Sequence, residues 1–241
     1  MNTDMINKKQ SMPVNSQSKI SVEDRLRLLN SLKDEINLNE ENIYEALDLD
    51  LKKPRFETYA TEIGFLLNEI ELFIKKLKSW SKPQRIRPAL INFPSKDYII
   101  FEPYGKVLVI SPWNYPFQLA LLPAMSAFAA GNSVVLKPSE HTPNTSRLIK
   151  KIVEKVFSKE LMRVVEGDSK TASKLLEKKW DYIFFTGSVK VGEIVAIAAA
   201  KKLTPYTLEL GGKSPAIINS DTDLKLASKR IVWGKFLNSG Q

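Results

Sequence analysis

The sequence of 241 residues contains no cysteine and only one histidine, His141. The absence of cysteine excludes disulfide bonds, thiolate metal ligands and a cysteine nucleophile supplied by these residues. A single histidine cannot form a cluster of metal ligands, so we predict no metal site. Because hydrophobic residues occupy 43% of positions, the chain is nevertheless expected to bury a core and to fold as a globular protein.

Long uninterrupted hydrophobic runs are also scarce. Residues 1–18 are polar and lack the apolar core of a secretory signal, which predicts a polar leader and a cytoplasmic protein. The stretch Val107–Leu136 carries no charge, but three prolines interrupt it. A helix broken in this way leaves backbone groups unsatisfied in lipid, so we favour a strand, a loop, a helix and a strand over a membrane span.

Acidic residues are too few to balance the basic ones, and the formal net charge is +9. One run of basic residues has no acid within it: Lys75, Lys76, Lys78, Lys82, Arg85 and Arg87. Such a run raises nucleic acid as a partner, because phosphates attract clustered lysine and arginine. No zinc finger, helix-turn-helix signature or aromatic RNA-binding motif accompanies it. We therefore interpret it as a solvated face after a helix and expect no nucleic-acid partner.

The first third of the chain has helical periodicity. Ser21-Val22-Glu23-Asp24 is typical of a capping box, and apolar residues at helical spacing follow it towards Leu49. A clearer amphipathic pattern predicts a second helix over residues 61–78. We assign residues 19–82 to N-terminal helices. Prolines then break the pattern before a short apolar segment that favours a strand, so residues 83–104 are predicted to form a projecting hairpin.

From Lys106 onwards, short β-rich apolar runs alternate with helical segments. The predicted strands are Val107–Ile110, Val134–Leu136, Arg163–Val165, Tyr182–Phe185 and Tyr206–Leu208. The predicted helices lie at about 117–130, 143–157, 169–178 and 189–202. Strands joined by crossover helices favour an α/β fold with a doubly wound parallel sheet, a Rossmann-like arrangement typical of dinucleotide-binding domains. We assign this domain to residues 105–210.

Polar residues and glycines follow the strands of this sheet. In such sheets ligands bind beyond the carboxyl ends of the strands, where loops meet helix N-termini. The candidate binding residues are Ser111, Trp113 and Asn114 after the first strand, Lys137 and Glu140 after the second, Thr186, Gly187, Ser188 and Gly192 after the fourth, and Glu209, Leu210 and Gly211 at the end of the fifth. We expect these loops to meet at one edge.

Gly187 to Gly192 form a G-S-x-x-x-G sequence between a strand and a helix. Glycine permits the backbone to approach a pyrophosphate closely, and the helix terminus offers N–H groups. The spacing differs from the usual G-x-G-x-x-G of dinucleotide sites. A structural turn followed by a close-packing glycine is therefore an open alternative.

Lys137 can reach a cofactor hydroxyl or phosphate, and Glu140 can accept hydrogen bonds from both hydroxyls of an adenosine ribose. A carboxylate there favours NAD over NADP, because it would face the additional 2′-phosphate of NADP. A surface lysine and an acid at the start of a helix are the alternative.

Two polar residues are candidates for catalysis. Asn114 lies between Trp113 and Tyr115, where its side-chain NH₂ could donate to a developing oxyanion, although asparagine is also an ordinary turn residue. Glu209 precedes two glycines at a strand end and could activate water in a confined site. Pairing of Glu209 with Lys213 is the alternative for that carboxylate.

Four segments in this order resemble the aldehyde dehydrogenase superfamily: Ser111–Phe117 (SPWNYPF), Lys137–Glu140 (KPSE), Phe185–Ser188 (FTGS) and Leu208–Pro215 (LELGGKSP). With the WGKFLNSGQ segment at the C-terminus, they are most similar to the class 3 branch, which oxidises fatty and aromatic aldehydes. The likeness runs from about Lys19 to Gln241.

The resemblance implies NAD(P)-dependent oxidation of an aldehyde to a carboxylic acid, through thiohemiacetal and thioester intermediates on a cysteine. It implies that Asn114 helps to hold the oxyanion and that Glu209 activates the hydrolytic water. The other candidate residues would bind NAD, with NADP possible. A small-molecule aldehyde would be the partner, and complete members are expected to be homodimers.

In the family, the nucleophilic cysteine closely follows an N-x-G-Q run, which is present here as Asn238–Gln241. Because no cysteine follows, we expect an N-terminal fragment in which residues 211–241 are the start of a catalytic domain. Such a fragment should be inactive alone and should expose an apolar surface on its C-terminal side. A noncatalytic dinucleotide-binding or interaction module is the alternative function.

Overall fold

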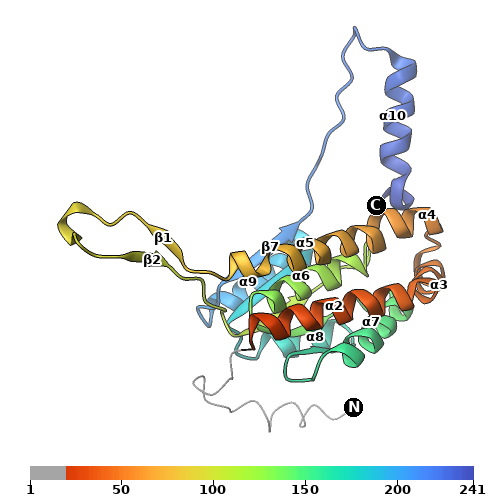
Figure 1. Ribbon diagram of the computed structural model, residues 1–241. Helices are drawn as coiled ribbons and strands as arrows, with labels where there is room; N and C mark the ends of the chain where they lie inside the picture. The colour runs from red at the N-terminus through yellow and green to blue at the C-terminus, as the bar shows by residue number, and fades with distance from the viewer. Residues whose placement is uncertain (1–19) are drawn as a thin grey trace.

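The computed structural model describes residues 20–241, so the predicted polar leader at residues 1–18 lies outside the described residues. A five-stranded parallel sheet with the order β5-β4-β3-β6-β7 forms its centre (Figure 1). The strands are β3 (Lys106–Ile110), β4 (Ser133–Lys137), β5 (Met162–Val164), β6 (Tyr182–Gly187) and β7 (Tyr206–Leu210). All five predicted strands are confirmed, and their ends differ from the predicted ones by at most two residues.

The crossover helices are α6 (Gln118–Ala129), α7 (Pro143–Val156), α8 (Ser169–Leu176) and α9 (Val189–Ala200). They confirm the predicted alternation and the doubly wound fold. From β3 the chain builds one half of the sheet through β4 and β5, and it then returns to the other side of β3 for β6 and β7. The strand order therefore reverses between β3 and β6, where a doubly wound sheet opens a crevice at its carboxyl edge.

The central strand β3 shows why this sequence forms a sheet covered on both faces. Val107 and Val109 pack into the core beneath α6, α7 and the N-terminal helices. Leu108 and Ile110 point to the opposite face and join the core with α8 and α9. Side chains alternate between the faces of a strand, so a strand buried on both sides must be apolar at every position.

The N-terminal helices cover one face of the sheet. They are α2 (Val22–Leu38), α3 (Glu40–Leu51), α4 (Arg55–Thr58) and α5 (Gly64–Trp80), with a π-helical turn, η2 (Tyr59–Ile63), between the last two. The Ser21 hydroxyl accepts from the Asp24 N–H at 3.0 Å, as the capping box predicts. The helical pattern predicted towards Leu49 is interrupted at Asn39, whose side chain donates to the Glu35 carbonyl and carboxylate.

A hairpin projects from the body of the molecule (Figure 1). Its strands β1 (Gln84–Ile86) and β2 (Asp97–Ile99) pair antiparallel, with a short 3₁₀ turn, η3 (Leu90–Asn92), between them. The prediction of a hairpin before the sheet is confirmed. The six residues of the basic run all lie exposed on α5, the hairpin and the turn that joins them, as expected for a solvated face.

The C-terminal segment leaves the sheet after β7 and returns as α10 (Leu224–Phe236), which stands away from the body, followed by a short 3₁₀ turn, η4 (Leu237–Gly240) (Figure 1). No side chain of α10 is buried, and Trp233 and Phe236 are among its exposed apolar residues. The exposed apolar surface expected on this side is therefore present. In the part of the chain that the structure describes, no helix is long and apolar enough to cross a bilayer.

Candidate functional site

A cleft of about 930 Å³ opens where the strand order reverses. Three of the predicted loops reach it: those after β3, β6 and β7. The predicted residues that line it are Trp113, Asn114, Thr186, Gly187, Ser188, Glu209, Leu210 and Gly211. From this edge the cleft continues along α6, where Leu119, Leu122 and Pro123 give it an apolar wall.

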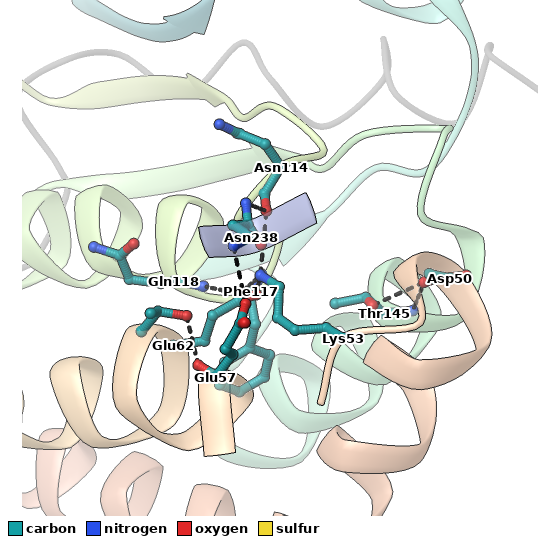
Figure 2. Close-up of polar contacts among 10 residues, drawn as sticks. Asp50, Lys53, Glu57, Glu62, Asn114, Phe117, Gln118, Thr145 and Asn238 are labelled. Carbon is teal, nitrogen blue, oxygen red and sulfur yellow. Dashed lines mark hydrogen bonds and ion pairs between the residues drawn. The ribbon is translucent and has the colours of Figure 1, made fainter. Parts of the chain in front are cut away.

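Asn114 lies in the loop between β3 and α6, and its two ends differ in their contacts. Its backbone carbonyl accepts from the Lys53 Nζ at 3.2 Å and from the Asn238 Nδ2 at 2.9 Å. Its carboxamide extends away from these contacts (Figure 2), and the Oδ1 atom is buried without a hydrogen-bond partner among residues 20–241. A buried amide oxygen without a donor is costly, so this side chain is suited to bind a ligand group in the cleft.

The loop after β6 presents a helix N-terminus to the cleft. The Ser188 hydroxyl caps α9 by accepting from the Val191 N–H at 3.4 Å. The first N–H groups of a helix have no partner within it and attract anions such as a pyrophosphate. Beneath the loop, a Cβ on Gly187 would lie 2.5 Å from the Phe185 ring, which accounts for the glycine at this position.

Gly192 does not line the cleft but faces β7. A Cβ there would lie 2.8 Å from the Leu210 Cδ2, so the backbone of α9 packs against the end of a side chain on β7. This contact supports the close-packing alternative for Gly192. A contact between Gly192 and a cofactor stays a prediction.

Lys137 and Glu140 lie beside the cleft, at the end of the neighbouring strand β4, and do not line it. The Lys137 side chain is 4% exposed, and its Nζ donates to the Glu140 Oε2 at 2.6 Å. Partial burial works to raise the pKa of Glu140, but the hydrogen bond from Lys137, a backbone N–H and the lysine charge outweigh it and leave the pKa lowered. Glu140 is therefore an ionised acceptor at neutral pH.

Ser111 directly follows β3 and lies beside the end of β4. Its N–H donates to the Lys137 carbonyl at 3.1 Å and extends the pairing of β3 with β4. Its hydroxyl oxygen is buried and has no hydrogen-bond partner among the described residues. This unpaired hydroxyl is a second group at the carboxyl edge that a ligand could satisfy.

Glu209 lies in β7 opposite Thr186 of β6, so its position is set by the strand register. It is exposed and lines the cleft. Within residues 20–241, no ion pair joins it to Lys213, the alternative considered for this carboxylate. Its contact with the cleft leaves it available to a ligand or to water.

Three residues near Asn114 were not among the predicted site residues. Lys53 and Glu62 form a buried ion pair below the loop, and Asn238 contacts the same loop from the C-terminal turn. Glu62 could have been found from its pattern, because it stands four residues before the buried Leu66 on the apolar stripe of a helix. A charge on such a stripe indicates a buried partner.

Comparison with known proteins places the chain among proteins of one family. The model of the "Aldehyde dehydrogenase family" matches residues 6–241. The 4,4'-diaponeurosporen-aldehyde dehydrogenase of Staphylococcus aureus is 46% identical over 227 residues, which are 94% of this chain and 50% of that relative. The chain thus spans about half the length of the curated relatives that it matches.

Solved structures agree with this comparison. A substrate-bound state of Staphylococcus aureus AldH superposes with a TM-score of 0.91 at 46% identity and covers 94% of this chain and 50% of that one. An NAD⁺ complex of an aldehyde dehydrogenase from Bacillus cereus superposes with a TM-score of 0.82 at 28% identity, over 96% of this chain and 46% of that one.

Proposed function

The chain belongs to the aldehyde dehydrogenase family, and from this premise we propose that its cleft serves the NAD-dependent oxidation of an aldehyde to a carboxylic acid. One observation carries the proposal: the loops after β3, β6 and β7 bring Asn114, Ser188 and Glu209 to the same cleft at the reversal of strand order. The same cleft holds the glycine of the loop after β6, the Asn114 side chain and the exposed carboxylate of Glu209.

The residues at the carboxyl edge fit a dinucleotide. The N-terminus of α9 with Ser188 would take the pyrophosphate, and the unpaired Ser111 hydroxyl offers a further hydrogen bond. Lys137 and Glu140 would hold the adenosine ribose hydroxyls. The lowered pKa of Glu140 supports NAD over NADP, because an ionised carboxylate repels a 2′-phosphate.

The remaining candidates would line the path of the cofactor between this edge and the reaction centre. They are Trp113, Thr186, Gly187, Leu210 and Gly211, all of them in the wall of the cleft. The cofactor supplies the chemistry of hydride acceptance. The residues of this chain bind and orient it.

Asn114 and Glu209 would act on the aldehyde itself. The Asn114 NH₂ would donate to the oxyanion that forms when a nucleophile attacks the carbonyl carbon. Glu209 would take a proton from the water that releases the acid. The apolar wall along α6 favours an apolar aldehyde. Because the 241 residues contain no cysteine, we propose that they cannot complete this reaction alone.

Isothermal titration calorimetry of the chain with NAD tests the proposal. We expect binding by the wild type and a loss of at least tenfold in affinity for Ser188→Trp, because an indole at the helix N-terminus would fill the space of the pyrophosphate. Ser158→Trp is the matched control, since Ser158 is also exposed but precedes β5, at the opposite edge of the sheet. A wild type that binds no NAD would refute the cofactor site.

The same protein distinguishes an incomplete enzyme from a binding module. We expect no NADH from NAD and an aldehyde such as octanal with the chain alone. Aldehyde-dependent NADH formation that Glu209→Ala abolishes would refute inactivity of the chain. NAD binding without turnover fits both a fragment and a noncatalytic dinucleotide-binding module, and restored turnover upon addition of a cysteine-bearing C-terminal half would favour the fragment.

A further inference from the structure

Lys53 and Glu62 form a buried ion pair that the proposed chemistry does not use. Lys53 is 4% exposed and Glu62 is fully buried. The Lys53 Nζ donates to the Glu62 Oε1 beneath the loop that connects β3 to α6 (Figure 2). Removing two charges from water costs several kcal/mol for each ion, so a pair at this position calls for a role beyond stability.

The pair holds the loop of Asn114 at its middle and at its C-terminal end, where α6 begins. Lys53 donates to the Asn114 carbonyl at 3.2 Å and lies over the Tyr115 ring, 4.4 Å from its centroid. The Glu62 Oε2 accepts from the N–H groups of Phe117 and Gln118 at 2.9 and 3.2 Å (Figure 2). Since α6 has no side-chain cap of its own, Glu62 acts as its cap from another helix.

The π-helical turn η2 supports this arrangement. Its wider turn brings side chains five residues apart closer to one face than an α-helix does, and π-turns often occur at functional sites. Glu57 precedes the turn and Glu62 lies within it. Both reach the same region, where Glu57 accepts from the Asn238 N–H at 3.0 Å and the Asn238 side chain donates to the Asn114 carbonyl at 2.9 Å (Figure 2).

These contacts fix the peptide of Asn114 and leave its side chain free. Two donors from different parts of the chain, Lys53 and Asn238, hold the carbonyl, while the carboxamide extends into the cleft. Burial raises the pKa of Glu62, and the charge of Lys53 and three hydrogen bonds oppose that rise. An apolar pair of equal volume would fill the same space but could not hold the carbonyl.

We propose that Lys53 and Glu62 are positioning residues that hold the loop of Asn114 so that its carboxamide faces the reaction site. This inference rests on the proposed function, because it assigns the pair to the oxyanion donor of that site. An error of about 1 Å in the position of such a group can cost on the order of 100-fold in rate, which gives a rigid support under the loop a catalytic value.

The variant Lys53→Met/Glu62→Gln tests the proposal. It removes both charges together, so no buried charge is left unpaired, and the glutamine oxygen can still accept from the start of α6. The protein is labelled with 5-fluorotryptophan, which reports on Trp80, Trp113, Trp180 and Trp233 by ¹⁹F NMR. Trp113, adjacent to Asn114, is assigned from the resonance that Trp113→Phe removes.

We expect the Trp113 resonance of the double variant to move or to split, because the loop has lost the hydrogen bond from Lys53 to the Asn114 carbonyl. The resonances of Trp80 and Trp180 should stay in place, since Trp80 packs against Phe73 and Trp180 donates to the Leu175 carbonyl. Lys33→Met/Glu71→Gln is the matched control. It removes a Lys–Glu pair of 2.9 Å between α2 and α5, and it should leave the Trp113 resonance unchanged. An unchanged Trp113 resonance in the Lys53→Met/Glu62→Gln variant would overturn the proposal.

Calorimetry with NAD on the same variants separates this proposal from the proposed function. We expect the double variant to retain most of its affinity for NAD, because Ser188 and Lys137, which would hold the pyrophosphate and the ribose, follow β6 and end β4, outside the loop that the pair supports. A tenfold or greater loss of affinity would contradict a local positioning role. If the wild type binds no NAD while the Trp113 resonance still responds to the double variant, then the cofactor function fails and the support of the loop stands.

Discussion

Asp50 offers a test of how the N-terminal helices fix the cofactor edge of the sheet. It lies near the end of α3, and its carboxylate reaches the first turn of α7, more than 90 residues later in the chain. Asn144 donates from its N–H at 3.2 Å and its Nδ2 at 2.8 Å, and Thr145 from its N–H at 2.7 Å and its hydroxyl at 2.8 Å. Since Thr142 provides no side-chain cap, Asp50 is the cap of α7.

The expected cost of Asp50→Ala follows from which donors would lose their partner. Thr145 is fully buried, so water cannot replace the carboxylate at its N–H, whereas Asn144 is only half-buried. A buried donor without a partner costs about 1–3 kcal/mol, and an N-cap contributes about 0.5–2 kcal/mol. Because the Thr145 hydroxyl can turn to a helix carbonyl, we expect the free energy of unfolding to fall by about 2–4 kcal/mol.

Urea denaturation followed by circular dichroism measures this loss. With a slope of roughly 2–3 kcal/mol per M, the midpoint should fall by about 1 M. Asp48→Ala is the matched control on the same helix. In the described part of the chain, the exposed Asp48 carboxylate pairs only with Lys52, at 3.5 Å, so its loss should cost less than about 0.5 kcal/mol. If the two substitutions lower the free energy of unfolding equally, Asp50 does not cap α7 in the way described.

Two further predictions concern the cofactor edge. The pKa of Glu140 is lowered in the folded protein, so its contribution to stability is present above the ordinary glutamate pKa of 4.5 and is lost as the pH falls through the lowered value. Glu140→Gln should therefore reduce the free energy of unfolding at pH 7. The loss should be about 1 kcal/mol or less, because Glu140 is partly exposed. Urea titrations near pH 3 should show a smaller difference between the variant and the wild type. Gly192→Ala should leave the free energy of unfolding unchanged or raise it by up to about 1 kcal/mol. Alanine favours the helix, and the exposed end of the Leu210 side chain can move aside. A fall of more than about 1 kcal/mol in the same assay would show that the Leu210 side chain cannot move.

Local pattern was sufficient to predict most of the fold. The strands β3, β4 and β6 each contain an uninterrupted apolar run, and the cap at Ser21 depends only on Asp24, three positions later. The break at Asn39 was not predicted, because apolar spacing continues across it while a buried side chain ends the helix there. The domain boundaries assigned from the sequence stay a prediction.

The candidate site, like the fold, could be predicted only in part from the sequence. The loops that carry Asn114, Ser188 and Glu209 could be placed at one edge from the sequence, because parallel strands end on the same side of a sheet. Which of these residues line the cleft could not be predicted from the sequence. Ser188 lines it, whereas Gly192 packs against Leu210, and Lys137 pairs with Glu140 beside the cleft. These differences depend on the packing of helices against strands.

The sequence by itself determined the elements, their order and the edge at which polar loops gather, because these follow from the periodicity and turn chemistry of neighbouring residues. Only the tertiary structure decided that Lys53 and Glu62 lie under Asn114 and that Asp50 caps α7. These contacts join residues 55 to 95 positions apart. No local pattern encodes such pairs, since they form only when whole helices pack on the sheet and bury charges that must find partners there.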